Sequence, residues 1–288
     1  METEKRILGV GSTGRQGGAV TKHLLKNGWS VRALTRNSSS EKAAKLKKHG
    51  ADVVQGDLDD PEQVRYFFEG VYGVFSVQNP WITGLEKEIE HGKLIADLAK
   101  AADVKHIVYS SAGPGSTGSG VPHFDSKVQI EKHIKELQLP YTILRPSGFM
   151  EMMSDKDFVP ALVTWNVTGK MLGDNFPVGW IAVDDIGAVA AKVFAETEKY
   201  IGKELDLTGD IKCMSECRSI YRDVNGKNPF RIPAPVWLFK LMQKDLYKMY
   251  AWTKSEPVSR QSIIETKKII GETTSVEKWM ASHKNDMG

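Results

Sequence analysis

Two features of the sequence predict an α/β protein built on a doubly wound parallel sheet, followed by a smaller, mainly helical carboxyl-terminal lobe. In the first half of the chain, short runs rich in Val and Ile alternate with longer amphipathic runs. A glycine-rich segment separates the first run of each kind. Parallel neighbours need a crossover connection, usually a helix, so the alternation indicates parallel pairing and a Rossmann-type sheet.

The elements follow one another in a regular order. The predicted strands are residues 6–10, 30–35, 52–55, 73–77, 106–110 and 141–144. The predicted helices between them are residues 16–26, 41–49, 61–69, 86–101 and 126–137. The third helix has the clearest start, because Asp60 can cap it and Pro61 takes its first position.

The pattern changes after Pro146. Residues 1–151 are expected to form the Rossmann-type domain, to which 180–209 return with a helix at 186–195 and a strand at 204–207. Residues 152–179 and 210–288 are expected to form the lobe on the substrate or partner side. The aromatic stretch from 235 to 252 fits a helical core, the wall of an apolar ligand pocket, or a surface for a partner protein.

Composition excludes several classes of protein. The 39 Lys and Arg residues against 36 Asp and Glu give a net charge of only +3, spread along the chain, so nucleic acid is not the expected partner. Cys213 and Cys217 are too few for a disulfide framework and have no zinc-site spacing, so we expect free thiols and no metal. The chain has neither a signal-peptide pattern nor the ~20 apolar residues of a membrane span, and a cytoplasmic location is expected.

The strongest chemical signal is the segment from Gly9 to Gly17. It fits G-x-G-x-x-G starting at Gly9 or G-x-x-G-x-x-G starting at Gly11, and we favour the second because the first would end the strand at Leu8. Glycines there let backbone N–H groups approach a pyrophosphate at a helix amino terminus, where the helix dipole favours negative charge. A glycine loop between a strand and a helix therefore predicts a dinucleotide site.

The end of the second strand distinguishes the two pyridine nucleotides. NAD sites place an acid there, about 20 residues past the loop, to accept from the ribose 2′-hydroxyl. This chain has Arg36 instead, with Lys42 as a possible helper, so we expect the 2′-phosphate of NADP(H). After the third strand, Gly56 and Asp57 fit either contact with the adenine amino group or an ordinary turn.

These and other blocks resemble the NmrA-like branch of the atypical short-chain dehydrogenase/reductases. They are residues 11–17 (GSTGRQG), 35–37 (TRN), 54–57 (VQGD), 77–81 (VQNPW), 123–127 (HFDSK), Arg145-Pro146 and 184–187 (DDIG). The resemblance implies a set of cofactor-lining residues: Gly11, Ser12, Thr13, Gly14, Arg15, Gln16, Gly17, Arg36, Gly56, Asp57, Gln78, Asn79 and Pro80. It also implies Lys127 on the nicotinamide ribose, and Gly148, Phe149, Met150 and Glu151 near the ring. Glu41 departs from the family, whose members often carry further basic residues there.

The usual catalytic pair of this superfamily is Tyr and Lys four residues apart, but here that spacing is His123 and Lys127. Lys127 or His123 can handle the proton in a reductase. Alternatively, the site binds NADP(H) without turnover, or Lys127 simply forms an exposed ion pair with Glu131. Ser110 and Ser111, which end the fifth strand, can donate to a substrate carbonyl or cap the next turn.

Two functions follow from these alternatives. The favoured one is an NADPH-dependent reductase of a small hydrophobic acceptor, a quinone, an enone or a carbonyl compound. The other is a catalytically silent NADP(H) redox sensor that binds a regulatory protein partner, as regulators of the NmrA-like group are thought to do. A homodimer is compatible with either function, and no membrane partner is expected.

Overall fold

The computed structural model describes residues 5–116, 118–154, 161–230 and 236–286. The chain separates into two units, each assembled from several segments. The first contains Met1–Thr117, His123–Arg145 and Ile186–Leu205, and the second contains Gly118–Pro122, Pro146–Asp185 and Asp206–Gly288. Four segments expected in the Rossmann domain cluster with the second unit: residues 118–122, 146–151, 180–185 and 206–209.

The first unit is built on a seven-stranded sheet with the order β3-β2-β1-β4-β5-β6-β9. Its strands are β1 (Arg6–Val10), β2 (Ser30–Thr35), β3 (Asp52–Gln55), β4 (Val71–Ser76), β5 (His106–Ser110), β6 (Tyr141–Pro146) and β9 (Lys203–Leu207). All five ladders that join β1 to β6 are parallel. The predicted doubly wound Rossmann-type sheet is confirmed, and the fourth strand begins two residues and ends one residue before its predicted bounds.

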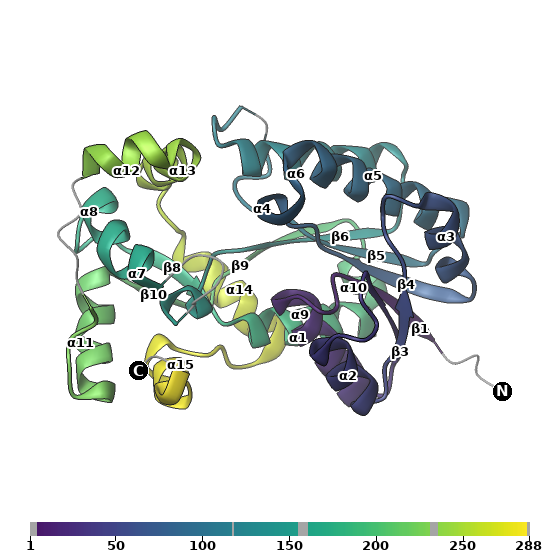
Figure 1. Ribbon diagram of the computed structural model, residues 1–288, viewed down its shortest axis with the longest axis horizontal. Coiled ribbons are helices and arrows are strands. Elements are labelled where there is room, and N and C mark those ends of the chain that lie inside the picture. The colour runs from purple at the N-terminus through teal and green to yellow at the C-terminus, as the bar shows by residue number, and fades with distance from the viewer. Residues whose placement is uncertain (1–4, 117, 155–160, 231–235, 287–288) are drawn as a thin grey trace. The chain divides into compact units, whose positions relative to one another are not determined.

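Helices cover both faces of this sheet (Figure 1). One face carries α3 (Pro61–Arg65), α5 (Leu85–Ala101) and α6 (Pro122–Glu136), and the other carries α1 (Arg15–Lys26), α2 (Glu41–Lys48) and α9 (Val183–Ala195). Short elements complete the unit: η1 (Tyr66–Phe68), α4 (Pro80–Thr83) and α10 (Thr197–Tyr200). Fully buried Leu8, Val74, Ile95 and Ile130 share one core cluster, so the sheet packs tightly on α5 and α6.

A glycine brings α5 and α6 close together, and its replacement is expected to destabilise the fold. A Cβ at Gly92 would lie 2.4 Å from Cδ1 of Ile130, a fully buried side chain. Overpacking costs about 1–3 kcal/mol, and the gain in helix propensity returns up to about 1 kcal/mol. Gly92→Ala should therefore lower the free energy of unfolding, measured in urea, by about 1–2 kcal/mol. Lys100→Ala, an exposed change on the same helix, should alter it by less than about 0.5 kcal/mol.

Helix α6 begins at Pro122, four residues before the predicted start. Proline suits the first helical position because no helical partner is needed for an N–H there. His123 therefore lies in the first turn of α6 rather than in a loop. Its spacing of four residues places it on the same helix face as Lys127.

The second unit contains a three-stranded sheet with the order β10-β8-β7 and is otherwise mainly helical, as predicted. The strands are β7 (Gly148–Phe149), β8 (Val178–Ile181) and β10 (Asp210–Lys212). The helical elements are η2 (Met150–Met153), α7 (Ala161–Val163), η3 (Thr164–Thr168), α8 (Gly169–Leu172), α11 (Met214–Asn225), α12 (Val236–Met242), α13 (Lys244–Ser255), α14 (Arg260–Ile270), α15 (Val276–Ser282) and η4 (Lys284–Asp286). Buried Trp165, Trp180, Tyr221 and Trp279 form its core with Met150.

The aromatic stretch on α12 and α13 is only partly core. Tyr250 is buried and its hydroxyl lies 2.8 Å from that of Thr168, whereas Trp237 and Leu241 are exposed. Within the described ranges, no helix combines the length and apolar character that crossing a bilayer requires.

Candidate functional site

The glycine loop joins β1 to α1 through a turn that needs glycine. Strand β1 continues to Val10, so the spacing that starts at Gly11 describes the turn, as favoured from the sequence. Gly11 has a φ of +77°, and a Cβ at Gly17 would lie 2.2 Å from the carbonyl oxygen of Gly11. The chain can therefore fold back on itself only because both residues lack side chains.

The amino terminus of α1 presents its backbone N–H groups. Gly14 is the N-cap and offers no side chain to them, and the first turn carries no acidic residue. The buried hydroxyl of Ser12 donates to the carbonyl of Gly9 at 2.9 Å, so it stabilises the turn. Thr13 and Gln16 are half-buried, and Arg15 is exposed. N–H groups at the positive end of a twelve-residue helix fit a diphosphate.

The loop lies where the order of the strands reverses. Chain order runs outward from β1 through β2 to β3 on one side and resumes at β4 on the other, and such a switch point opens a crevice at the carboxyl ends of the strands. A Cβ at Gly11 would lie 3.0 Å from Cγ1 of Val77, the residue that follows β4. The ends of β1 and β4 are thus in close contact at the site.

Gln78, Asn79 and Pro80 form the turn that follows β4. Gln78 is buried, and its amide nitrogen donates to the hydroxyl of Ser76 at 2.9 Å. Its amide oxygen is buried and has no hydrogen-bond partner among the described residues. Asn79 caps α4 by accepting from the N–H of Trp81 at 3.0 Å, and Pro80 is the first residue of that helix. An orphaned acceptor beside the glycine loop fits a site that is completed by a bound ligand.

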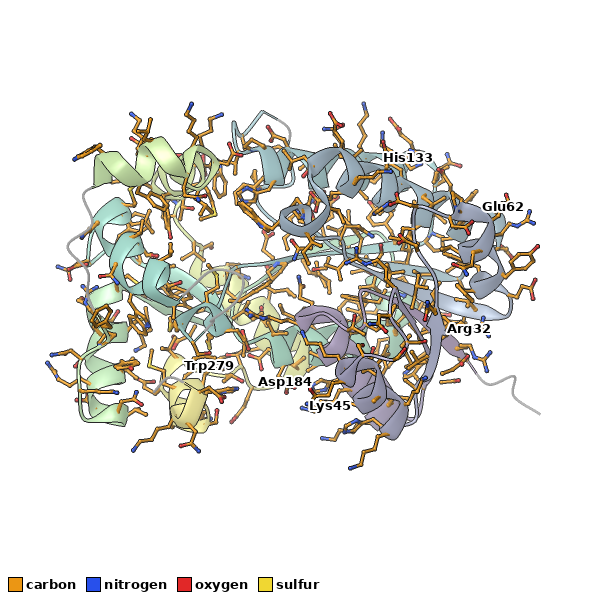
Figure 2. The ribbon with its side chains drawn as sticks, viewed as in Figure 1. Arg32, Lys45, Glu62, His133, Asp184 and Trp279 are labelled. Carbon is orange, nitrogen blue, oxygen red and sulfur yellow. The ribbon has the colours of Figure 1, made fainter. Side chains whose placement is uncertain are left out.

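Arg36 lies in the loop after β2 with its side chain exposed. Within the described part of the chain, no hydrogen bond or ion pair engages its guanidinium group. Glu41, the residue that departs from the family, pairs with Lys45 at 2.7 Å, and Lys45 projects from α2 (Figure 2). The hydrogen bond from Lys45 lowers the pKa of Glu41. The carboxylate of Glu41 thus stays ionised, and Lys45 partly compensates its charge.

A second cation reaches the same loop. Lys47 donates to the carbonyl oxygen of Ser38 at 3.3 Å, and Ser38 is tied to the side chain of Gln55 at 2.7 Å. Lys42 is exposed in the first turn of α2. The sequence did not single out Lys47. A signal was present, because Lys47 follows Ser40, the N-cap of α2, by seven residues, and this spacing places both on one face of the helix.

The turn after β3 uses Asp57 to hold itself together. The Oδ1 atom of Asp57 accepts from the N–H of Asp59 at 3.1 Å, and the N–H of Gly56 donates to the carbonyl of Thr35 at 3.0 Å. Asp60 caps α3 as predicted, accepting from the N–H of Gln63. The turn-forming role of Asp57 is therefore observed, and its contact with adenine stays a prediction.

Lys127 is buried, with 8% of its surface exposed, and does not form the exposed pair with Glu131 that its spacing allows. Its ammonium nitrogen lies 2.8 Å from Oε1 of Glu88 and 3.2 Å from the carbonyl oxygen of Gln78. Glu131 is also buried and is engaged by Arg145, whose Nη2 atom lies 2.6 Å from Oε2. Tertiary packing thus overrides the helical spacing and turns Lys127 toward the ends of the strands.

The serines at the end of β5 are committed to partners within the protein. Ser111 donates to Oε1 of Glu131, and Ser110 donates to the side-chain oxygen of Gln16 at 2.7 Å. A hydroxyl has one proton to donate, so in this arrangement both protons are used within the protein, and among the described residues neither serine caps the following turn. Donation from Ser110 or Ser111 to a substrate carbonyl stays a prediction.

Tyr109 does not replace the missing catalytic tyrosine. Its ring is fully buried in β5, and burial, with the nearby charges of Glu88 and Glu131, raises the pKa of the phenol well above its ordinary value. His123 is buried beside two aromatic rings. The centroid of its imidazole ring lies 5.3 Å from the ring centroid of Trp81 and 4.7 Å from that of Phe124. Packing accounts for its position on α6, and its catalytic role stays a prediction.

Gly148, Phe149, Met150 and Glu151 belong to the second unit. Gly148 and Phe149 form β7, and Met150 is fully buried in η2. The Oε1 atom of Glu151 accepts from the N–H of Val183 at 3.0 Å and from the indole of Trp279 at 3.3 Å. Burial raises the pKa of Glu151. That these residues lie near a nicotinamide ring stays a prediction.

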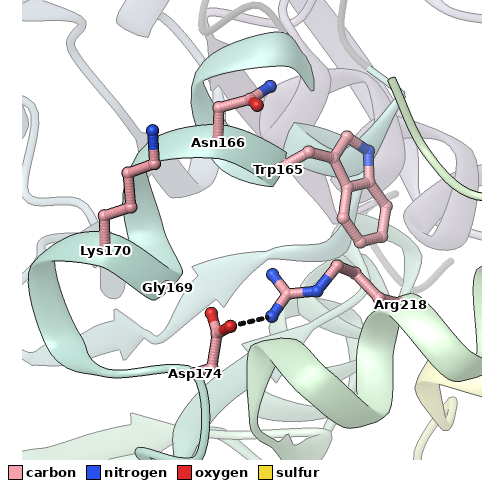
Figure 3. A pocket seen from close by; sticks show the side chains of 6 residues that line it. All are labelled: Trp165, Asn166, Gly169, Lys170, Asp174 and Arg218. Atoms are coloured by element: carbon pink, nitrogen blue, oxygen red, sulfur yellow. Dashed lines mark ion pairs between the residues drawn. The ribbon is translucent and has the colours of Figure 1, made fainter. Parts of the chain in front are cut away.

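The second unit also contains a pocket of about 310 Å³ (Figure 3). The residues that line it are Trp165, Asn166, Gly169, Lys170, Asp174 and Arg218. Arg218 reaches from α11 to Asp174, with 2.6 Å between Nη2 and Oδ2. None of these six residues belongs to the predicted cofactor set.

Comparison with known proteins shows which protein family the chain resembles over most of its length. The model of the NmrA-like family matches residues 3–280. An NmrA-like family domain-containing protein of Dictyostelium discoideum is 30% identical over 242 residues, which cover 77% of this chain and 78% of the relative. An NmrA-like family domain-containing oxidoreductase of Cladobotryum sp. is 30% identical over 248 residues, covering 77% and 74%.

Solved structures share the fold. NmrA, a negative transcriptional regulator in complex with NADP, superposes with a TM-score of 0.77 at 19% identity over 97% of this chain and 95% of that one. Triphenylmethane reductase of Citrobacter sp. complexed with NADP(H) gives 0.75 at 21% identity, covering 97% and 99%. A quinone oxidoreductase of Escherichia coli complexed with NADPH gives 0.75 at 22% identity, also covering 97% and 99%.

Proposed function

This chain belongs to the NmrA-like family, and from that premise we propose that it is an NADPH-dependent reductase of a small hydrophobic acceptor such as a quinone, an enone or a carbonyl compound. One observation carries the proposal: the buried ammonium group of Lys127 donates to the carbonyl oxygen of Gln78 at the switch point of the sheet. The glycine loop lies next to this point, and no side chain caps the helix that follows the loop. The names of the relatives agree with it, since they include oxidoreductases and reductases solved with NADP(H) or NADPH.

The residues present fit a dinucleotide. Its holders would be the N–H groups of 11–17 for the diphosphate, Arg36 with Lys42 and Lys47 for the 2′-phosphate, the turns at Gly56–Asp57 and 78–80, and Lys127 for the nicotinamide ribose. When bound, the nicotinamide supplies a hydride from C4. The chain's own part is to hold the diphosphate, neutralise the extra phosphate and present N–H donors at Lys127.

The proton that a reduction also needs has three sources: Lys127, His123 or water. Lys127 is the favoured one because its Nζ atom carries three donors and the described residues occupy only two of them, through Glu88 and Gln78. The third can face the reacting carbonyl or the ribose. His123 lies one helical turn before Lys127, among aromatic rings.

Lys127→Ala is expected to abolish turnover. Mixing the protein with NADPH and a panel of quinones, enones and aldehydes, and following the loss of NADPH absorbance, should show a fall in kcat of about 100-fold or more, as for a general acid. Circular dichroism should verify that the variant is folded, because the change leaves Glu88 buried without its cation. Lys132→Ala, on the exposed side of the same helix, is the control and should keep full activity. Unchanged turnover in Lys127→Ala would contradict the assignment.

A second function is favoured by a different observation. Both serines at the end of β5 donate hydrogen bonds within the protein, and Tyr109 is fully buried in the core. Few of the described side chains near the site are therefore available as proton donors for catalysis. A catalytically silent redox sensor that binds a protein partner needs none. Tight NADPH binding without turnover of any acceptor, together with a nucleotide-dependent change in oligomeric state, would support the sensor over the reductase.

A further inference from the structure

Lys127 owes its position to a carboxylate from a neighbouring helix. Glu88 lies in the first turn of α5 with a fully buried side chain and accepts from Lys127. We propose that Glu88 is the positioning residue of the site, fixing the Lys127 ammonium at the switch point so that it meets the nicotinamide half of the dinucleotide. This rests on the proposed function and extends it to a residue outside the predicted site.

Both oxygens of Glu88 are engaged by consecutive residues of α6. Oε1 accepts from Lys127 at 2.8 Å, and Oε2 accepts from the hydroxyl of Ser126 at 2.6 Å. Lys127 makes its other contact with the carbonyl of Gln78 at 3.2 Å. The carboxylate therefore cannot rotate without losing a hydrogen bond, and the ammonium is held between α5 and the turn after β4.

Packing alone does not require this pair. Taking two charges out of water is costly, and well-packed apolar residues often stabilise a fold equally well. Gly92 and Ile130 already bring α5 and α6 into close apolar contact. What the pair adds is a cation at a defined point. Glu88 tolerates burial there because the amino terminus of α5 favours a negative charge.

The hydroxyl of Tyr109 forms no hydrogen bond with Glu88 or with Lys127. It is buried without a hydrogen-bond partner among the described residues. Burial and the charges of Glu88 and Glu131 raise the pKa of Tyr109, so the phenol stays neutral and leaves Glu88 as the counter-ion of Lys127. Glu131, the other buried acid of this region, is held by Arg145.

Binding of two ligands, one with and one without the nicotinamide half, distinguishes positioning of Lys127 by Glu88 from a general structural role of Glu88. Binding of NADPH and of 2′,5′-ADP, which lacks the nicotinamide riboside and the phosphate attached to it, is measured by calorimetry for the unsubstituted protein, Glu88→Gln, Lys127→Met and the double variant. Glu88→Gln and Lys127→Met are each expected to weaken NADPH binding about tenfold, the loss of one charge-assisted hydrogen bond. Each should change the affinity for 2′,5′-ADP less than about twofold. In the Lys127→Met background, Glu88→Gln should weaken NADPH no further.

Asp97→Asn is the matched control, because Asp97 also joins α5 to α6, through His133 at 2.7 Å on the exposed side (Figure 2 labels His133). It should leave both affinities unchanged. If Glu88→Gln does not fold, Glu88→Asp keeps the charge on a shorter side chain and should show an intermediate loss for NADPH alone. Equal losses for both ligands, or additive losses in the double variant, would overturn the role of Glu88. An unsubstituted protein that binds neither ligand would overturn the proposed function itself, and with it this role.

Discussion

Gly17→Ala is expected to abolish pyridine-nucleotide binding, with no heat detectable by calorimetry at any practical concentration of NADPH. The added methyl group would lie 2.2 Å from the carbonyl oxygen and 2.5 Å from the carbonyl carbon of Gly11, and 2.8 Å from the nitrogen of Ser12. All three are backbone atoms, so the clash can be relieved only by moving the loop that would hold the diphosphate. A loss of 1000-fold or more corresponds to about 4 kcal/mol, within reach when several N–H groups are displaced together.

The neighbouring glycine provides a control for that experiment. A Cβ at Gly18 would lie 3.3 Å from the carbonyl oxygen of Ser12, a contact that a shift of a few tenths of an ångström relieves. Gly18→Ala should therefore bind NADPH within about threefold of the unsubstituted protein, as expected for a site inside a helix that prefers alanine. If Gly17→Ala binds as well as Gly18→Ala does, the loop does not hold the diphosphate.

Arg36→Glu is expected to change which nucleotide the protein prefers. Removing the guanidinium deletes a charge-assisted contact with the 2′-phosphate, and the new carboxylate repels that phosphate, so the Kd for NADPH should rise about 100-fold. The Kd for NADH should change less than about threefold, because NADH has no 2′-phosphate and an acid at this point can accept from its ribose. Titrating both nucleotides into one protein preparation gives the ratio directly.

A charge reversal elsewhere tests whether net charge explains the result. Lys105 directly precedes β5 and so lies at the amino ends of the parallel strands, whereas Arg36 follows the carboxyl end of β2. Its side chain is largely exposed. Lys105→Glu makes the same change in net charge and should leave the NADPH-to-NADH ratio unaltered. Parallel losses for both nucleotides in Arg36→Glu would contradict the assignment of the 2′-phosphate to Arg36.

The sheet was predictable because its signal is local. Each strand of a parallel sheet is a short apolar run, and each crossover carries its own helical period, so β1 to β6 and their order of succession follow from neighbouring residues. The glycine turn was predictable for the same reason, since Gly11 and Gly17 meet within seven residues. The error in α6 arose because His123 and Phe124 continue no clear apolar period, although Pro122 is a helix-start signal.

The surroundings of Lys127 were not predictable, because they depend on contacts between distant segments. Spacing along one helix pointed to Glu131, four residues on, but that acid is claimed by Arg145 from β6. The true partner, Glu88, lies 39 residues earlier on another helix. Neither pairing has a signature in the sequence, because it is the packing of α5 against α6 that decides which carboxylate each cation can reach.

The first unit draws its last strand from far along the chain, and this has a consequence for synthesis. Strand β9 (Lys203–Leu207) pairs beside β6, which ended almost sixty residues earlier. Until the ribosome has released that later segment, the outer margin of β6 offers unpaired backbone groups to any other chain. A nascent polypeptide stalled near residue 151 would therefore be prone to aggregation. A chain truncated there should aggregate rather than accumulate as an independent nucleotide-binding domain.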